Sequence, residues 1–383
     1  MKIAIDFIST CKIVDSIAKY AGGTNYAKQR ILFLKEQCLM SGHNILLLVK
    51  NEFKVSEKEE KKLFENIEFV YANDLTQVDY SKFDILYLPQ VNGTTLLKIP
   101  SIKKKNESLK ILATLHDRQH NITKFDKYDR YYCSGIKRFL IVSLGYYIFK
   151  KVIFNCLYNH CVKYIDKIIT VSNYSMQKLN DNVSSIKYYL NNKILFKEDV
   201  SIERGDYCLF VGGNRPEKNL IRTLEAFCFF KKETRSDTKM IVTGINDEFK
   251  KVIHNKKFLN QSILEKDVVF IDYVPMDELA RLYAKSRYVV FTSKCEGYGL
   301  PVKEALSYGK PVMASNVTSI PEVAGAVAHY VNPFDTLSIK KGFIFFENQS
   351  VLSHYEHAAQ KRYRILEKIS ELDDEEFFFD FIN

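Results

Sequence analysis

The chain alternates short runs of consecutive apolar residues with longer segments in which apolar residues recur every three or four positions. Short apolar runs are typical of strands in a parallel sheet that helices cover on both faces. Segments such as Tyr26–Met40 have the spacing of amphipathic helices. The predicted strands are Lys2–Ile8, Ile45–Val49, Ile85–Leu88, Ile111–Leu115, Lys167–Val171, Tyr207–Val211 and Tyr288–Phe291. This alternation of strands and helices predicts the α/β class with doubly wound domains.

The length of 383 residues, 46% of them hydrophobic, predicts two domains that each have a core of their own. A charged stretch with little apolar content, residues 197–206, is the expected boundary. We therefore expect an N-terminal domain over residues 1–198 and a second domain over residues 199–353. The remaining residues, 354–383, begin with a helical pattern.

The segment 288–311 combines a buried strand, a glycine loop and a short helix. Gly297 and Gly299 allow a sharp turn and a close approach of the backbone to a ligand. The helix start that follows places free amides at the carboxyl end of the strand, where open α/β sheets bind anionic ligands. Glu296 and Glu304 bracket the loop, and each carboxylate can accept hydrogen bonds from sugar hydroxyls. The plainer interpretation is that Glu296 caps an ordinary helix and Glu304 is solvated.

A second glycine loop, Gly212–Asn219, follows the strand Tyr207–Val211. Arg215 and Lys218 lie three residues apart at the entrance of a helix, where two cations oppose the helix dipole unless an anion compensates them. Arg215 suits bidentate binding of a phosphate, and Lys218 supplies a compact point charge. The pattern favours a diphosphate site, and the alternative is a pair of surface charges.

These two segments resemble the C-terminal domain of family-four retaining glycosyltransferases of the GT-B architecture, over about residues 203–345. The resemblance implies two Rossmann-like domains facing a cleft, with residues 354–383 packing back on the N-terminal, acceptor-binding domain. It implies that Arg215 and Lys218 bind the donor diphosphate, that Glu304 binds the ribose, and that Glu296 is catalytic. The other donor-binding residues that it implies are Val274, Gly297, Tyr298, Gly299 and Leu300. Asp272 departs from the family, which usually has glycine there, so the nucleobase stays open.

In the N-terminal half, His116 follows the strand Ile111–Leu115 and therefore lies at a carboxyl strand end. From the residues alone it is as much a structural histidine as a functional one. The resemblance implies a catalytic position for His116, beside the donor sugar. Gly22 and Gly23 would bring the backbone close to the donor diphosphate or to the acceptor, although a tight turn explains them almost as well.

The chain contains no Asp-x-Asp sequence, with which another class of glycosyltransferases holds a metal on the diphosphate. We therefore expect neither metal nor cofactor, and cationic side chains and amides would stabilise the leaving nucleoside diphosphate. The resemblance implies attack on the same face of the sugar, which retains its configuration. The donor is a guanosine or a uridine diphosphate sugar, and the likeness of residues 315–325 to bacterial mannosyltransferases favours GDP-mannose.

The net charge of +10 arises in residues 101–200, which hold 18 Lys or Arg against 8 Asp or Glu. Basic residues flank the apolar segment 139–149, which is too short to span a bilayer but could lie on an anionic membrane surface. A buried helix with solvated ends is an equal alternative. The membrane interpretation implies a lipid-linked saccharide acceptor in cell-surface polysaccharide synthesis. No nucleic-acid partner is expected, because no recognisable binding module accompanies the basic block.

Eight cysteines without a Cys-x-x-Cys pair, and a chain that enters a strand at Lys2, predict a reduced cytoplasmic protein without a secretory signal. A peripheral location on the inner face of the cytoplasmic membrane stays open. Two other functions also stay open. An NAD-dependent oxidoreductase is disfavoured, since no Gly-x-Gly-x-x-Gly follows the first strand. A non-catalytic sensor of nucleotide sugars is poorly excluded by the sequence.

Overall fold

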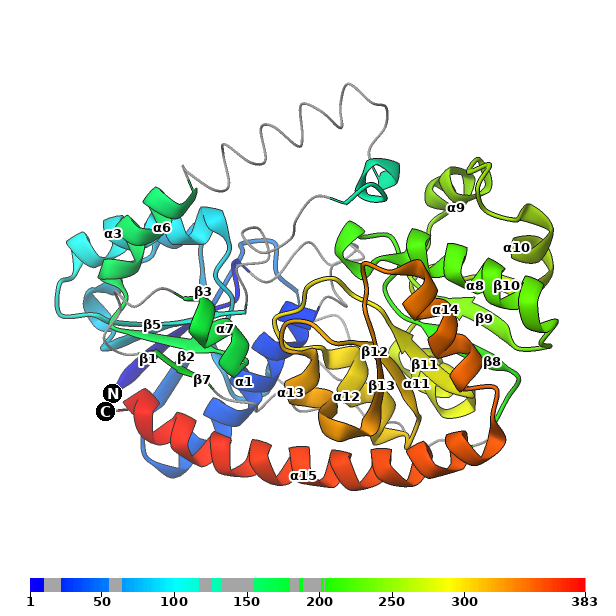
Figure 1. The fold of residues 1–383 in the computed structure, drawn as a ribbon. Coiled ribbons are helices and arrows are strands. Elements are labelled where there is room, and N and C mark those ends of the chain that lie inside the picture. Colours follow the sequence, from blue (N-terminus) through cyan, green and yellow to red (C-terminus); the bar gives the residue numbers. More distant parts are fainter. Residues whose placement is uncertain are drawn as a thin grey trace. The chain divides into compact units, whose positions relative to one another are not determined.

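The computed structural model describes residues 1–9, 22–54, 64–116, 126–132, 154–179, 186–188, 201–202 and 204–382. These residues form two compact units, and each unit is built on one parallel sheet (Figure 1). The predicted α/β class with two doubly wound, Rossmann-like domains is confirmed.

The first unit contains a seven-stranded sheet in the order β3-β2-β1-β4-β5-β6-β7, in which every neighbouring pair is parallel. Its strands are β1 (Lys2–Asp6), β2 (Asn44–Val49), β3 (Glu68–Tyr71), β4 (Ile85–Leu88), β5 (Lys110–Leu115), β6 (Lys167–Thr170) and β7 (Ile186–Tyr188). The α-helices described between them are α1 (Gly22–Met40), α3 (Gly93–Lys105), α6 (Phe154–Cys161) and α7 (Asn173–Lys178). Helix α1 begins at Gly22 and not at Tyr26, so the predicted glycine loop contributes Gly22 and Gly23 to the first helical turn.

The second unit contains a six-stranded parallel sheet in the order β10-β9-β8-β11-β12-β13. Its strands are β8 (Tyr207–Phe210), β9 (Lys239–Val242), β10 (Val268–Phe270), β11 (Tyr288–Phe291), β12 (Val312–Ser315) and β13 (Ala328–Val331). Its helices are α8 (Leu220–Thr234), α9 (Asp247–His254), α10 (Gln261–Asp267), α11 (Met276–Lys285), α12 (Leu300–Ser307), α13 (Ile320–Ala324) and α14 (Thr336–Phe345). Strands β8 and β11 are neighbours at the centre of the sheet, so the two predicted loops leave from adjacent strand ends.

The core of the second unit is dominated by aromatic side chains where α8 and α14 lie side by side (Figure 1). The ring of Phe343 lies 5.3 Å from that of Phe227 and 5.5 Å from that of Phe230, measured between centroids. Aromatic pairs at such distances add to the stabilisation that comes from burial. This packing holds the middle of α8, the helix that follows directly on the first glycine loop.

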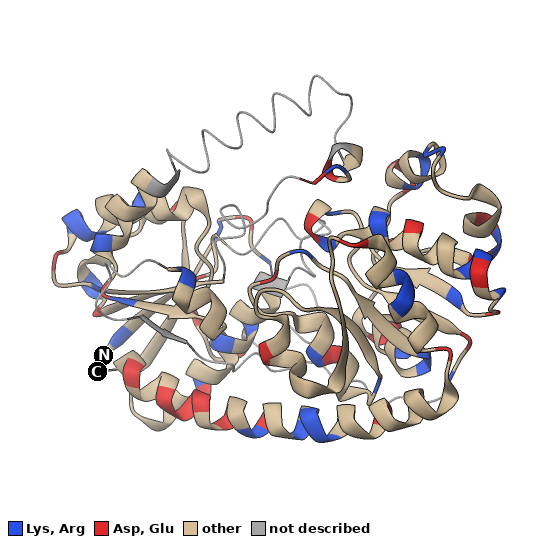
Figure 2. Cartoon of the chain, in the orientation of Figure 1, with Lys and Arg blue, Asp and Glu red and all other residues tan. Residues whose placement is uncertain are grey.

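Helix α15 (Gln349–Ile382), red in Figure 1, is one continuous helix of 34 residues. Basic residues gather in its middle and acidic residues toward its C-terminal end (Figure 2). Its residues from Ile369 onward belong to the first unit, where Asp374 and the buried Arg30 of α1 form an ion pair of 2.7 Å. The earlier residues belong to the second unit, where Arg362 donates to the carbonyl of Val323 at 3.0 Å.

The limits of the two units differ in two places from the expected domains 1–198, 199–353 and 354–383. The second unit keeps α15 as far as Lys368, beyond the expected limit. It also includes the described residues 126–132, which the sequence assigns to the first domain. The second difference arises because residues 126–132 form ion pairs with α8 and with the loop after β11. Near residue 198 the change from the first unit to the second falls between Leu195 and Phe196.

Candidate functional site

The first loop, Gly212–Asn219, is shaped by close packing against the connection that follows β9. A Cβ atom on Gly213 would lie 2.6 Å from Cδ1 of Ile245 and 2.9 Å from Cδ2 of Leu220, so no larger residue fits without a shift. The amide of Gly213 donates to the carbonyl of Thr243 at 3.1 Å. The loop then forms a single 3₁₀ turn, Pro216–Lys218, that carries the predicted phosphate-binding cations.

The second loop connects β11 to α12 and is held by side chains from the start of the next strand–helix connection. The hydroxyl of Ser319 donates to the carbonyls of Glu296 and Tyr298 at 2.9 and 3.0 Å. The amide of Glu296 donates to the hydroxyl of Thr318 at 3.1 Å. Gly299 has φ of 105°, in the left-handed region that glycine adopts without strain, and α12 begins immediately after it at Leu300.

Direct hydrogen bonds join the two loops. The carbonyl of Glu217 accepts from the amide of Lys294 at 2.7 Å and from the hydroxyl of Ser293 at 2.9 Å. The side-chain amide of Asn219 donates to the carbonyl of Thr292 at 3.1 Å. The structure therefore brings the two motifs that the sequence singled out into one site.

At the centre of this site, the ammonium of Lys218 lies 2.6 Å from Oε1 of Glu296. Both side chains are buried, with exposed fractions of 6% and 10%. The ammonium also lies 5.0 Å from the centre of the Phe291 ring, within the range of a cation–π interaction. Arg215 is the exposed cation of the pair: its side chain is 55% exposed and lies 3.3 Å from Glu217. One predicted cation is therefore held inside the site, and the other lies at its surface.

Glu304, one turn into α12, is half-buried, and its Oε2 accepts a hydrogen bond of 2.6 Å from the hydroxyl of Tyr283. Burial raises the pKa of Glu304, while the Tyr283 hydrogen bond and the nearby Lys218 ammonium counteract that rise. The Lys218 ammonium, which is paired with Glu296, therefore also interacts electrostatically with the Glu304 carboxylate.

The remaining predicted donor residues of the second unit lie on two segments. Tyr298 is buried, and Leu300 is the first residue of α12. Val274 lies between β10 and α11 and is partly exposed. The neighbouring Asp272 carbonyl accepts from the amide of Gly244 at 3.4 Å. Among the described residues, Val274 makes no hydrogen bond to the two loops, so its assignment stays a prediction.

His116 belongs to the first unit and lies directly after β5. Its Nε2 is 3.1 Å from the carbonyl of Pro89, which can only accept, so Nε2 carries the proton and donates. The ring packs edge-on against Tyr26 with 4.7 Å between ring centroids. Burial lowers the pKa of His116 to about 4, so the imidazole is neutral at physiological pH.

Residues 126–132, a segment that the sequence did not mark, contact the site from its outer side. Lys294, two residues before Glu296, has a buried ammonium that is ion-paired with Asp129. Asp126 pairs with Arg222 of α8 at 2.5 Å, again with both side chains buried. The Asp129–Lys294 partners are 165 positions apart. No local pattern could therefore have indicated this contact.

Two further aromatic residues strengthen that attachment. The Tyr128 hydroxyl donates to Glu225 of α8 at 2.5 Å. The ring of Tyr132 stacks on Phe249 of α9 with 5.0 Å between centroids, and its hydroxyl accepts from the amide of Ile221 at 3.4 Å. An amide in the first turn of α8 is thus already occupied by a side chain of the chain itself.

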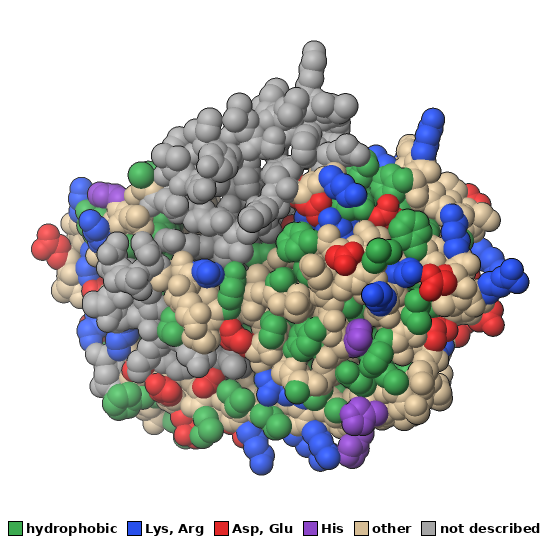
Figure 3. Space-filling model, viewed as in Figure 1, with side chains coloured by type: hydrophobic (Ala, Val, Ile, Leu, Met, Phe, Trp, Pro, Cys, Tyr) green, Lys and Arg blue, Asp and Glu red, His purple; other side chains and the backbone are tan. Residues whose placement is uncertain are grey.

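Further observations bear on the predicted metal-free reaction and on the predicted membrane contact. Among these residues, no group of three or more His, Cys, Asp or Glu is placed to hold a metal ion. In the same ranges, none of the helices combines the length and apolar character that crossing a membrane requires. The apolar segment 139–149 lies outside the described residues. Over the second unit, hydrophobic side chains are interspersed with polar and charged ones on the face shown in Figure 3.

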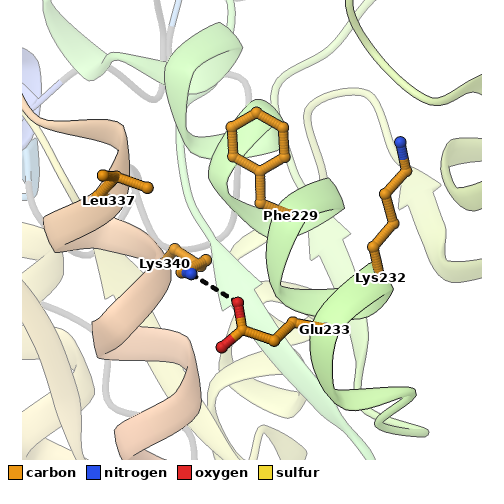
Figure 4. A pocket seen from close by; sticks show the side chains of 5 residues that line it. All are labelled: Phe229, Lys232, Glu233, Leu337 and Lys340. Atoms are coloured by element: carbon orange, nitrogen blue, oxygen red, sulfur yellow. Dashed lines mark hydrogen bonds and ion pairs between the residues drawn. The ribbon is translucent and has the colours of Figure 1, made fainter.

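A surface pocket of about 300 Å³ lies between α8 and α14 (Figure 4). Its lining residues are Phe229, Lys232, Glu233, Leu337 and Lys340. Figure 4 shows Lys340 reaching across to Glu233, at 2.6 Å. None of the predicted site residues lines this pocket, so it is separate from the paired loops.

The fold of the chain matches those of solved structures. It superposes on sucrose-phosphate synthase from Thermosynechococcus elongatus with a TM-score of 0.70, covering 100% of this chain and 99% of the other at 13% identity. HepE of Anabaena, in complex with UDP and glucose, gives a TM-score of 0.65 at 14% identity and 99% coverage of both chains. The chain has the GT-B fold of these glycosyltransferases, as predicted.

Sequence matches to known proteins fall in part of the chain. Residues 192–361 match the model of the glycosyl transferases group 1 family. The chain is 36% identical over 133 residues to O-antigen chain mannosyltransferase B of Escherichia coli, covering 35% of this chain and 34% of that protein. It is 29% identical over 193 residues to O-antigen chain mannosyltransferase RfbU of Salmonella typhimurium, covering 49% and 53%. The matched part thus spans between a third and about half of the length of these relatives.

Proposed function

We propose that the chain is a retaining, metal-independent glycosyltransferase that moves a hexose from a nucleotide-diphosphate sugar to a saccharide acceptor in cell-surface polysaccharide synthesis. The observation that carries the proposal is the junction of the two loops, where the buried ammonium of Lys218 is paired with Glu296 and interacts electrostatically with Glu304. A pyrophosphate at Lys218 would lie close to both carboxylates. The similarity to two O-antigen mannosyltransferases supports GDP-mannose as the donor.

In the proposed reaction, the bond between the anomeric carbon and the diphosphate oxygen breaks, and the acceptor hydroxyl attacks from the same face. The leaving phosphate oxygen takes the acceptor proton. Lys218 and Arg215 stabilise the charge that develops on the nucleoside diphosphate, together with the amides at the start of α12. The Arg215 side chain, with its guanidinium at the surface, can move onto the ligand, whereas the buried Lys218 is already in place.

The roles proposed for the individual residues follow the family resemblance. Glu296 contacts the donor sugar as a catalytic residue, and Glu304 accepts from the ribose. Val274 and residues 297–300 contact the nucleotide and the sugar. His116, Gly22 and Gly23 are assigned to donor or acceptor contacts on the resemblance alone.

Turnover by the purified protein tests this proposal. GDP-mannose and UDP-glucose are incubated with saccharide acceptors, with and without EDTA, and the released nucleoside diphosphate and the anomeric configuration of the product are measured. We expect GDP release that EDTA does not affect, and a product with the donor's configuration. An inverted product contradicts the retaining reaction, and binding of the nucleotide without release under any acceptor favours the sensor.

The acceptor is proposed to be lipid-linked, with the basic residues of 101–200 in contact with an anionic inner membrane surface. The support is the concentration of 18 Lys or Arg in that block. Flotation with liposomes tests it: the protein should float with vesicles that contain phosphatidylglycerol and stay in solution with neutral vesicles. Equal behaviour with both vesicle types contradicts the electrostatic contact.

A further inference from the structure

The buried phenol of Tyr283 has a contact that the proposed reaction does not explain. Tyr283 lies on α11 with 1% of its surface exposed, and its hydroxyl donates to Oε2 of Glu304 at 2.6 Å. Tyr283 and Glu304 lie on different helices and are 21 positions apart. The hydrogen bond therefore fixes the carboxylate of α12 from a separate element of the fold.

The direction of this hydrogen bond is determined by chemistry. Burial and the adjacent Glu304 carboxylate raise the pKa of the Tyr283 phenol well above 10, so the phenol keeps its proton and donates. The ring is itself held in place, because Tyr308 stacks nearly parallel to it at 6.0 Å between centroids and 8° between planes. A rigid donor thus engages Oε2 of Glu304.

The other carboxylate oxygen is not engaged in this way. Within the described part of the chain, Oε1 of Glu304 makes no hydrogen bond or ion pair, and the residue is only partly buried. A carboxylate that is free to rotate can present either oxygen to a diol. With Oε2 committed to a rigid phenol, one oxygen is presented in one orientation.

We propose that Tyr283 is a positioning residue for nucleotide recognition: it orients Glu304 so that Oε1 accepts one particular hydroxyl of the ribose. This inference rests on the proposed function, in which Glu304 binds the ribose. It adds that the two ribose hydroxyls are not equivalent. A hydrogen bond to a charged acceptor accounts for about tenfold or more in affinity, so the hydroxyl facing Oε1 should carry most of the discrimination.

Isothermal titration calorimetry on the full chain tests the inference with GDP, UDP, their 2′-deoxy and 3′-deoxy forms, and inorganic pyrophosphate. For the wild type, we expect that removing one ribose hydroxyl weakens binding of the nucleotide about tenfold. Removing the other ribose hydroxyl should weaken it less than about threefold. For Tyr283→Phe, the intact nucleotide should bind about tenfold more weakly, the difference between the deoxy forms should disappear, and pyrophosphate binding should not change. In kinetics, KM for the donor should rise while kcat changes little.

Tyr207→Phe is the matched control. Its hydroxyl donates to the carbonyl of Leu282 on the same helix α11 at 2.9 Å, so this variant also removes a tyrosine hydroxyl that is hydrogen-bonded to α11, without removing the hydrogen bond to Glu304. The control should keep the wild-type ratio of the deoxy forms. Tyr283→Met is a second variant without the hydroxyl, for use if the Phe variant does not fold.

The outcomes separate the inference from the proposed function. If the wild type distinguishes the two hydroxyls and Tyr283→Phe keeps the same ratio, the positioning role is overturned while the nucleotide site stands. If the wild type binds neither nucleotide, the proposed function and the inference both fail.

Discussion

The ion pair between Lys218 and Glu296 makes the substitution Lys218→Met a demanding test of the site. The side chains are only 6% and 10% exposed, so removing the ammonium leaves a carboxylate that is shielded from water and has lost its cation. Removing one partner of a buried pair costs about 3 to 5 kcal/mol of unfolding free energy, whereas replacing both partners costs far less. We expect Lys218→Met to lose about 3 kcal/mol, and the double variant Lys218→Met/Glu296→Gln to stay within about 1.5 kcal/mol of the wild type.

Urea unfolding followed by circular dichroism measures both variants, and calorimetry with pyrophosphate measures binding. Both should bind pyrophosphate about ten- to a hundredfold more weakly, since each lacks the ammonium. Lys340→Met is the control. Its pair with Glu233 has the same 2.6 Å separation, but Glu233 is 54% exposed, so the loss should be below about 1 kcal/mol. A double variant that loses as much stability as Lys218→Met, or undiminished pyrophosphate binding, would refute the reasoning.

Three further predictions concern titratable groups elsewhere. Burial raises the pKa of Asp6 to about 6 from 3.8, so its ionised form opposes folding as the pH rises through that range. In urea titrations, Asp6→Asn should therefore have an unfolding free energy about 3 kcal/mol higher than the wild type at pH 7.5, and the difference should disappear below pH 4. Equal stability of the two proteins at pH 7.5 would contradict the raised pKa of Asp6. His116→Gln should leave the shape of the activity profile between pH 5.5 and 8.5 unchanged, because burial lowers the pKa of His116 to about 4; a lost step near 6.5 would contradict this. Asp129→Asn should lower the free energy of urea unfolding by about 2 kcal/mol, because it leaves the Lys294 ammonium without its anion. The double variant Asp129→Asn/Lys294→Met should recover most of that stability. An Asp129→Asn variant as stable as the wild type would contradict the ion pair.

The strands and loops of the second unit could be predicted because their signals are local. Tyr288–Phe291 is a strand with the predicted limits, and the glycine-bearing loop and α12 follow it as expected. The two glycine loops come together because β8 and β11 are adjacent in a parallel sheet. The family resemblance implied that arrangement, since it assigns both loops to one donor site, and open α/β sheets bind ligands at the carboxyl ends of their strands.

The side-chain contacts of the site could not be predicted, because they join distant positions. Nothing near Lys218 in the sequence indicates that its ammonium pairs with a carboxylate 78 positions away. The same holds for Tyr283 and for the attachment of Asp129 to Lys294, whose partners come from other elements of the fold. Ion pairs of this kind depend on packing and not on propensity, so they become visible only in the structure.

The sequence also did not predict the residues at which two of the helices begin and end. The helical pattern expected over 354–369 is part of a helix that runs from Gln349 to Ile382, a stretch without glycine or proline. Glycine and proline, which commonly mark the end of a helix, are absent from this stretch, so the sequence contains no such signal for its limits. Helix α1 begins earlier than the sequence indicated. Gly22 and Gly23 predicted a loop, yet they lie in the first turn of the helix, where glycine is less destabilising than in the middle.

The most direct test of the central claim is a crystal structure of the protein with bound GDP. We predict diphosphate oxygens within hydrogen-bond distance of the Lys218 ammonium, with the Arg215 guanidinium turned onto the same group and the ribose at Glu304. A nucleotide bound with its diphosphate elsewhere, and with the Lys218–Glu296 pair unchanged, would contradict the claim.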